Sequence, residues 1–249
     1  MKTDMDLQFL QYCNNEDLRA LCDILVYDNK GELRLSESLS ISDSYLSCYP
    51  DNMKGMWRDL AAELQCYGGN TLLNLFRHGH GPKYESIVYD VCQKMGVENV
   101  GKHDTAEDME QKLLIAVSSK AMEEMTEEQI RAMMEECGVK GYDYTRAGLL
   151  AALLTLRLVN KRVFAYVIEA ILKMLMEILM VRGIIRAGFG LLSRGVGVLC
   201  GPVGWIILTG WTLWDIMGPA YRVTIPAVIQ VAYMRMKYQE KLNRNEEAA

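Results

Sequence analysis

Residues 195–234 read GVGVLCGPVGWIILTGWTLWDIMGPAYRVTIPAVIQVAYM, and the rest of the chain has to accommodate this apolar stretch. Residues 195–214 contain no charged side chain and hold three of the four tryptophans, Trp205, Trp211 and Trp214. An uncharged run of about 20 residues matches the ~30 Å thickness of a bilayer core. We therefore expect the stretch either to be buried in the protein's own core or to enter an apolar environment outside it.

The stretch is interrupted at Gly201-Pro202 and again at Gly218-Pro219. A helix between these breaks would be roughly 24 Å long, which is short for a straight membrane span. We predict a helical hairpin: a glycine-rich entry, a short tryptophan-rich helix, and an exit helix that Thr224 caps and whose first turn contains Pro226.

Arg222 lies among apolar neighbours and would need a carboxylate partner if it were buried. Asp215, seven residues earlier, is the obvious candidate, so we predict a buried Asp215–Arg222 pair at the corner of the hairpin. The candidate structural and interaction residues of the hairpin are Gly201, Pro202, Trp205, Trp211, Trp214, Asp215, Tyr221, Arg222, Thr224 and Pro226.

Charge divides the chain into two halves. Residues 1–146 hold 15 Lys and Arg against 26 Asp and Glu, whereas residues 147–249 hold 12 against 6. We predict an acidic helical domain over 1–146 and a basic, apolar helical domain over 147–249 that contains the hairpin 195–234. The acidic run between Glu123 and Glu136 is expected to be a solvated helix face, or a docking surface for the basic half or for a basic partner.

The remaining segments have the periodicity and capping signals of helices. Asn14 or Asn15 precedes a run with leucines at helical spacing, Gly96 follows another such run, and Thr105 forms a capping box with Asp108. Strand-like alternation bounded by hairpin signals does not occur in the sequence. The predicted fold class is all-α, a helical bundle with an apolar, Gly/Pro/Trp-rich C-terminal hairpin. The tail after Met234 is expected to extend a helix into solvent.

One long apolar helix is predicted from Val163 to about Val181. It carries Glu169, Lys173 and Glu177 at four-residue steps, which is one charged stripe on an apolar cylinder. Three such charges suit a bundle helix with one wet face better than a helix surrounded by lipid.

Seven cysteines, an odd number without C-x-x-C spacing, indicate a reducing compartment. The acidic start MKTDMDLQFL has no apolar core of a secretory signal. The expected location is the cytoplasm, including the cytoplasmic face of the inner membrane. Nucleic-acid binding is not expected, because the basic half is apolar and lacks a Lys/Arg stripe.

Three stretches resemble the uncharacterised bacterial YaaW family: the N-terminal Leu7-Gln8-Phe9-Leu10, the central Glu63-Leu64-Gln65 with Gly68-Gly69-Asn70, and above all Ala220 to Val228, AYRVTIPAV. Together with the segments between them they span most of the chain. The family is weakly related to the ubiquinol–cytochrome c chaperone family, and this relation implies an all-helical fold and a binding role. It implies no particular reaction, and a chaperone label inherited in this way is an analogy.

The best candidate for a metal site is weak. Cys66, His78, His80 and Cys92 form a C-x11-H-x-H-x11-C pattern, but structural zinc sites use closer pairs of ligands. The alternative is a surface loop with a core cysteine at Cys92. G-x-S-x-G, P-loop and H-E-x-x-H motifs do not occur in the sequence, so neither an enzyme nor a cofactor is expected.

These observations predict a non-catalytic interaction protein that associates with the membrane through its apolar hairpin. The first alternative is a soluble chaperone-like or scaffold protein that buries the hairpin in its own core. A constitutive membrane protein and, third among the functions, an enzyme that uses the His78/His80 loop are the others. The expected partner is a protein, with the membrane and a second copy of the chain as further candidates.

Overall fold

The computed structural model describes residues 4–28, 31–34, 37–68, 81–123, 126–136, 145–181 and 221–247. Within these ranges the fold is all-α, as predicted, and the only extended pairing is an isolated bridge between Tyr27 and Leu33. The elements are η1 (Met5–Tyr12), α1 (Asn15–Val26), α2 (Asp43–Cys48), η2 (Met53–Met56), α3 (Trp57–Gly68), α5 (Tyr84–Met95), α6 (Ala106–Glu123), α7 (Glu127–Glu136), α8 (Arg146–Val159), α9 (Lys161–Val181) and α12 (Tyr221–Glu247).

Several helix ends lie where local sequence signals place them. The side chain of Asn14 accepts a hydrogen bond from the backbone N–H of Asp17 and caps α1. Thr105 and Asp108 form the predicted capping box at the start of α6. Gly96 ends α5 with φ of 67°, the left-handed conformation that glycine adopts most readily.

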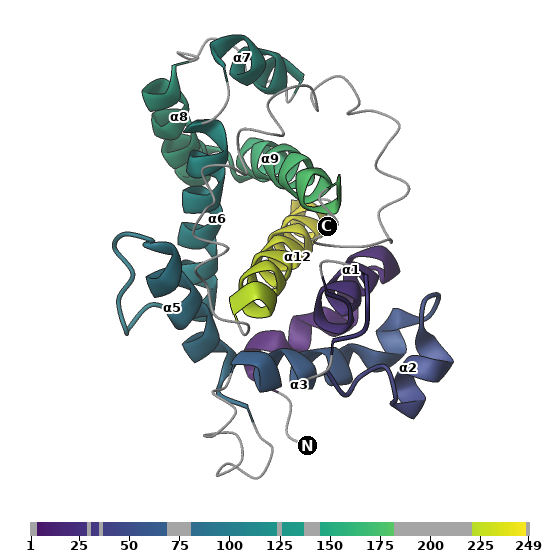
Figure 1. Ribbon diagram of the computed structural model, residues 1–249. Coiled ribbons are helices and arrows are strands. Elements are labelled where there is room, and N and C mark those ends of the chain that lie inside the picture. Colours follow the sequence, from purple (N-terminus) through teal and green to yellow (C-terminus); the bar gives the residue numbers. More distant parts are fainter. Residues whose placement is uncertain are drawn as a thin grey trace.

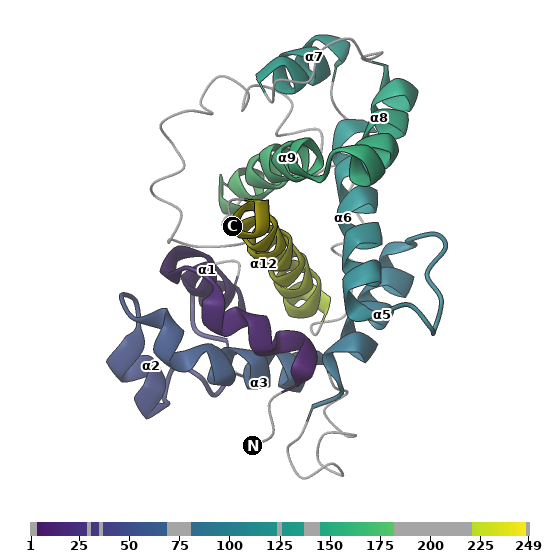
Figure 2. The ribbon, with the colours of Figure 1, turned by 180° about the vertical axis from the view of Figure 1, so that it is seen from behind.

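The C-terminal helix α12 is the centre of the molecule. It contacts η1, α1, α3, α5, α6 and α9, and Figures 1 and 2 show it enclosed by these helices. All ten residues from Val223 to Ala232 are buried, so this part of α12 has no solvated face. A helix that is apolar on every side needs such an enclosure.

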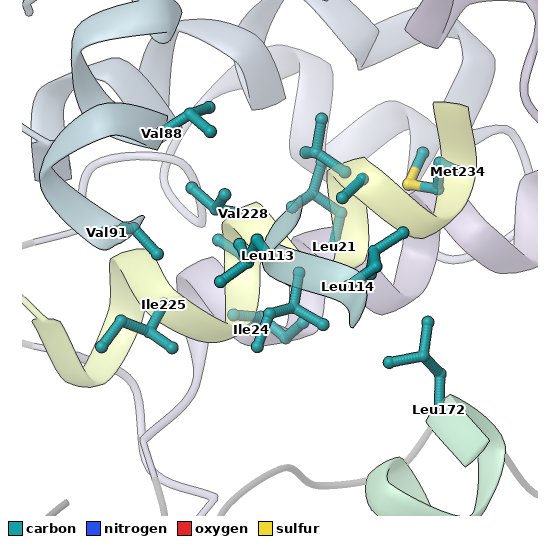
Figure 3. Packing of buried hydrophobic residues seen from close by; sticks show 14 of the residues in the cluster. Leu21, Ile24, Val88, Val91, Leu113, Leu114, Leu172, Ile225, Val228 and Met234 are labelled. Atoms are coloured by element: carbon teal, nitrogen blue, oxygen red, sulfur yellow. The ribbon is translucent and has the colours of Figure 1, made fainter. Parts of the chain in front are cut away.

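Apolar side chains from both halves of the sequence form one core around α12. Figure 3 shows Ile225, Val228 and Met234 of α12 among side chains of the surrounding helices, such as Leu21 of α1 and Leu113 of α6. Leu172 of α9 belongs to the same cluster of buried residues. The core therefore joins the first helix of the chain to the last.

The tail after Met234 differs from the prediction. Residues 235–240 are half-buried, and only 241–246 are exposed. Lys237 pairs with Asp17 of α1 at 2.7 Å, and Arg235 pairs with Glu110 of α6 at 2.6 Å. The prediction that the whole tail is solvated was wrong, because Arg235 and Lys237 bind carboxylates of the acidic half.

The structure leaves part of the hairpin untested. Residues 182–220 lie outside the described ranges, and the division into domains at residue 146 stays a prediction. None of the described helices is long and apolar enough to cross a membrane.

Candidate functional site

A buried ionic cluster links α12 to α5 and α6. The Nε of Arg235 donates to Oε2 of Glu110 at 2.6 Å, and its Nη2 donates to Oε1 at 3.3 Å. The hydroxyl of Tyr84 donates to the same Oε1 at 2.7 Å. The side chains of Glu110 and Arg235 are 2% and 13% exposed, so the charges are paired in a low-dielectric environment.

The N-terminal segment closes this cluster from the other side. Arg235 also donates from Nη2 to the carbonyl oxygen of Asp6 at 2.6 Å and stacks on the Phe9 ring, 4.2 Å from its centroid. Asp4 accepts the backbone N–H of Tyr84 at 2.8 Å. Residues 4–9 are thus held to the centre of the bundle by these contacts.

Burial and pairing act in opposite directions on this cluster. Burial raises the pKa of the Glu110 carboxyl, while the guanidinium of Arg235 and the hydroxyl of Tyr84 lower it. Burial and the adjacent Glu110 raise the pKa of Tyr84 well above its usual value. Both oxygens of Glu110 accept hydrogen bonds already, so the arrangement favours a structural role over proton transfer.

A groove of about 490 Å³ opens beside the cluster, between α6, α9 and α12. We call it the α6–α9–α12 groove. The residues that line it from α6 are Glu107, Glu110, Gln111 and Leu114. Those from α8 and α9 are Arg157, Leu158, Lys161, Arg162, Phe164 and Ala165. Those from α12 are Ala232, Arg235, Met236, Gln239, Glu240, Leu242, Asn243 and Glu246.

One residue, Asn160, makes the sharp corner between α8 and α9 at the edge of this groove. Its backbone N–H donates to the carbonyl oxygen of Leu156 at 2.8 Å and ends α8. Its side chain accepts a hydrogen bond from the N–H of Val163 at 3.2 Å at the start of α9. Leu158 and Val159 lie beside the corner and are 81% and 80% exposed.

The exit helix of the predicted hairpin begins earlier than expected. Tyr221 is already helical, so Thr224 lies inside α12, 3% exposed, and does not cap it. Pro226 is the sixth helical residue rather than part of the first turn. Because proline has no N–H, the helical hydrogen bond from residue 226 to the carbonyl of Arg222 is missing. Arg222 is exposed, so water can bond to this carbonyl instead.

Arg222 is exposed, and its predicted burial is wrong because α12 enters the core only at Val223. Pairing with Asp215 stays a prediction, since Asp215 lies outside the described residues. Tyr221 is half-buried, and the ammonium of Lys94 lies 5.3 Å from its ring centroid. The other hairpin candidates, Gly201, Pro202, Trp205, Trp211 and Trp214, also lie outside the described ranges.

The two cysteines of the metal candidate are in different environments. Cys92 is buried in the core, as the alternative predicted, and its thiol donates to the carbonyl of Met109 at 3.7 Å. Burial raises the pKa of Cys92 to about 12. Cys66 is exposed, and His78 and His80 lie outside the described residues. The part of the chain that the structure describes contains no group of three metal-ligating side chains.

The ionic cluster of Tyr84, Glu110 and Arg235 was not predicted from the sequence. Glu110 and Arg235 are 125 residues apart, and each looks like an ordinary helix-surface charge in its local sequence. One signal existed: Arg235 directly follows the apolar run that ends at Met234, so its side chain has to lie near buried surface.

Comparisons with known proteins identify relatives along nearly the whole chain. The sequence is 38% identical over 244 residues to a UPF0174 protein of Helicobacter pylori strain J99, covering 96% of this chain and 94% of the relative. It is 34% identical over 235 residues to the UPF0174 protein YaaW of Escherichia coli K12, covering 93% and 94%. Residues 1–35 match a domain of unknown function, DUF3944. No solved structure matches the chain.

Proposed function

The chain belongs to the UPF0174 family, which includes YaaW of Escherichia coli. We propose that it is a non-catalytic helical protein that associates with the membrane through residues 182–220, the stretch between α9 and α12. In the sequence, this stretch lies between α9, which ends at Val181, and α12, which begins at Tyr221. Residues 182–220 contain only four charged side chains, Arg182, Arg186, Arg194 and Asp215.

The observation that supports the proposal is the composition of the stretch. Residues 195–214 contain no charged side chain and hold three of the four tryptophans, at residues 205, 211 and 214. An uncharged run of about 20 residues matches the ~30 Å thickness of a bilayer core.

A second candidate is a soluble chaperone-like or scaffold protein that buries the stretch in its own core. The burial of α12 favours it, because Val223 to Ala232 directly follow the stretch and are enclosed on every side. This chain thus already covers one long apolar segment with its own helices.

Flotation with liposomes distinguishes the two candidates. We expect the full-length chain to float with vesicles and the variant Ile207→Asp/Leu208→Asp to stay in solution, because each charge at the bilayer centre costs about 3 kcal/mol. The matched control is Ile41→Asp/Leu46→Asp, which changes two side chains that are 80% and 71% exposed.

Thermal unfolding of the same variants completes the test. If the stretch is buried in the core, Ile207→Asp/Leu208→Asp lowers the melting temperature strongly, since it buries two unpaired charges. A full-length chain that does not float, together with that loss of stability, would reject membrane association in favour of the second candidate.

A further inference from the structure

Helix α8 is apolar on two opposite faces. It contacts α6 and α9, and the residues of its buried face are Leu149, Ala152, Leu153 and Leu156. The outward face carries four exposed apolar residues at positions i, i+4, i+7 and i+11, which we call the α8 stripe: Ala147, Ala151, Leu154 and Leu158. The stripe extends over about three turns, or roughly 17 Å. Leu154 and Leu158 are 47% and 81% exposed, so leucine side chains of this face are in contact with solvent.

The threonine beside the stripe has its hydroxyl bonded within the helix. Thr155 is exposed, and its hydroxyl donates to the carbonyl oxygen of Ala151 at 2.8 Å. This hydrogen bond persists when water is removed from the face, so covering the stripe with an apolar phase costs the hydroxyl no partner. The apolar surface continues at the corner between α8 and α9 with Val159, which is 80% exposed.

The charges near the stripe are mostly positive. Residues 146–168 contain four Lys or Arg and no Asp or Glu. Arg157 lies next to Leu158 and donates to the side chain of Gln111 at 3.0 Å, a neutral partner that leaves the guanidinium its charge. Lys161 and Arg162 are exposed at the corner, and Glu246 of α12 lines the same open pocket. Two cations and one anion give this pocket a positive balance, whichever of them pair.

These features fit a lipid surface better than a protein partner. A helix with exposed leucines and flanking cations is typical of the interface of an anionic membrane. A second copy of α8 would bring the same cations, which repel each other. Leu158 borders the α6–α9–α12 groove, whereas the lining of that groove does not include the rest of the stripe. The 14 residues of α8 extend over roughly 21 Å, so the helix fits in the plane of a bilayer but not across its ~30 Å core.

We propose that the α8 stripe is a docking surface for anionic membrane lipids. Leu154, Leu158 and Val159 enter the boundary between headgroups and acyl chains, and Lys161 lies at the level of the lipid phosphates. The site uses a different part of the chain from residues 182–220. It therefore does not depend on insertion of that stretch, and the two can be tested separately.

Photolabelling locates the contact along the chain. The full-length protein is mixed with vesicles of phosphatidylcholine and phosphatidylserine that contain a lipid with a diazirine on its acyl chain, and mass spectrometry maps the cross-links. We expect cross-links within residues 147–162, and far fewer when phosphatidylserine is left out. Cross-links within residues 182–220 report on the proposed insertion. Absence of cross-links within residues 147–162 would overturn the present proposal, whatever is found in the other stretch.

Substitutions measure the contribution of the stripe and of one cation. Leu154→Asp/Leu158→Asp should weaken binding to vesicles that contain phosphatidylserine at least about tenfold. Lys161→Ala should weaken it about fivefold, because each cation near an anionic surface adds to the attraction. These positions are exposed, so the melting temperature should stay close to that of the unsubstituted protein.

Matched controls make the same changes at exposed positions elsewhere. Ile41→Asp/Leu46→Asp and Lys102→Ala should leave vesicle binding unchanged. Equal effects of the controls and the α8 substitutions would overturn the proposal. Sedimentation velocity without lipid tests the competing occupant. A dimer that Leu154→Asp/Leu158→Asp dissociates would assign the stripe to a second copy of the chain and would also overturn it.

Discussion

The guanidinium of Arg235 on α12 lies against the carboxylate of Glu110 on α6, with Nε and Oε2 2.6 Å apart. The two residues come from the basic and the acidic half of the sequence, and they meet at the centre of the bundle. The pair fixes the rotation of α12, since turning this helix would leave both charges buried without partners. It also forms part of the floor of the α6–α9–α12 groove.

Removing one member of this pair should be far more costly than removing both charges. We expect Arg235→Met to lower the free energy of unfolding by about 3–5 kcal/mol, because it leaves the charge of Glu110 uncompensated. The double variant Glu110→Gln/Arg235→Met should lose less than Arg235→Met alone, since its amide oxygen still accepts the hydroxyl of Tyr84. Urea unfolding at pH 7 of these two variants and of Glu110→Gln completes the double-mutant cycle. Additive losses of unfolding free energy would show that the pair is not coupled.

Asp23 on α1 should make stability depend on pH. It is 2% exposed, its Oδ1 accepts from the hydroxyl of Tyr49 at 3.1 Å, and its Oδ2 has no hydrogen-bond partner among the described residues. Burial raises the pKa of Asp23 to about 7. Because this value lies above that of the unfolded chain, the contribution of Asp23 is fully present below about pH 4 and is lost as the pH rises through 7.

The variant Asp23→Asn tests this contribution. At about 1.4 kcal/mol per pKa unit, Asp23 should lower the free energy of unfolding of the unsubstituted protein by up to about 4 kcal/mol between pH 4 and pH 8. The variant should show a correspondingly smaller decrease over the same range in urea unfolding. Identical slopes for the two proteins would show that Asp23 is solvated or partnered in solution.

The capping box at the start of α6 should contribute measurably to stability. Thr105→Ala removes the acceptor of the Asp108 N–H, and we expect a loss of about 1 kcal/mol. Thr155→Ala is the control, because Thr155 is exposed inside α8 and alanine is the better helix former there. The control should therefore be neutral or slightly stabilising, and equal destabilisation by both changes would contradict the assignment.

Gly81 should not tolerate a side chain. A Cβ atom at this position would lie 2.0 Å from the backbone oxygen of Gln65, so the end of α3 would have to move. We expect Gly81→Ala to cost about 1–3 kcal/mol. Gly101→Ala, whose Cβ would meet nothing closer than 3.9 Å, is the matched control and should be nearly neutral in thermal unfolding.

Local features of the fold were predictable because they depend on residues close together in the sequence. The cap at Asn14 and the glycine end at Gly96 involve groups at most a few positions apart. The periodicity of apolar residues was likewise sufficient to predict an all-α fold. These signals say where helices begin and end, but not which helices meet.

Contacts between distant segments were not predictable from one sequence. The position of Thr224 suggested a cap, but α12 already begins at Tyr221, and Thr224 is buried inside the helix against other segments of the chain. The groove depends on three helices and on the corner at Asn160, whose neighbours resemble an ordinary break between helices in the sequence.

Fluorescence quenching in vesicles of brominated lipids tests whether the stretch between α9 and α12 enters the membrane. Trp57 lies in the bundle and is 7% exposed. Replacing it in the full-length variant Trp57→Phe leaves tryptophan only at residues 205, 211 and 214. We predict that bromine on the acyl chains quenches this variant strongly, with unbrominated vesicles as the control. Equal fluorescence in the two vesicle types would contradict insertion of the stretch.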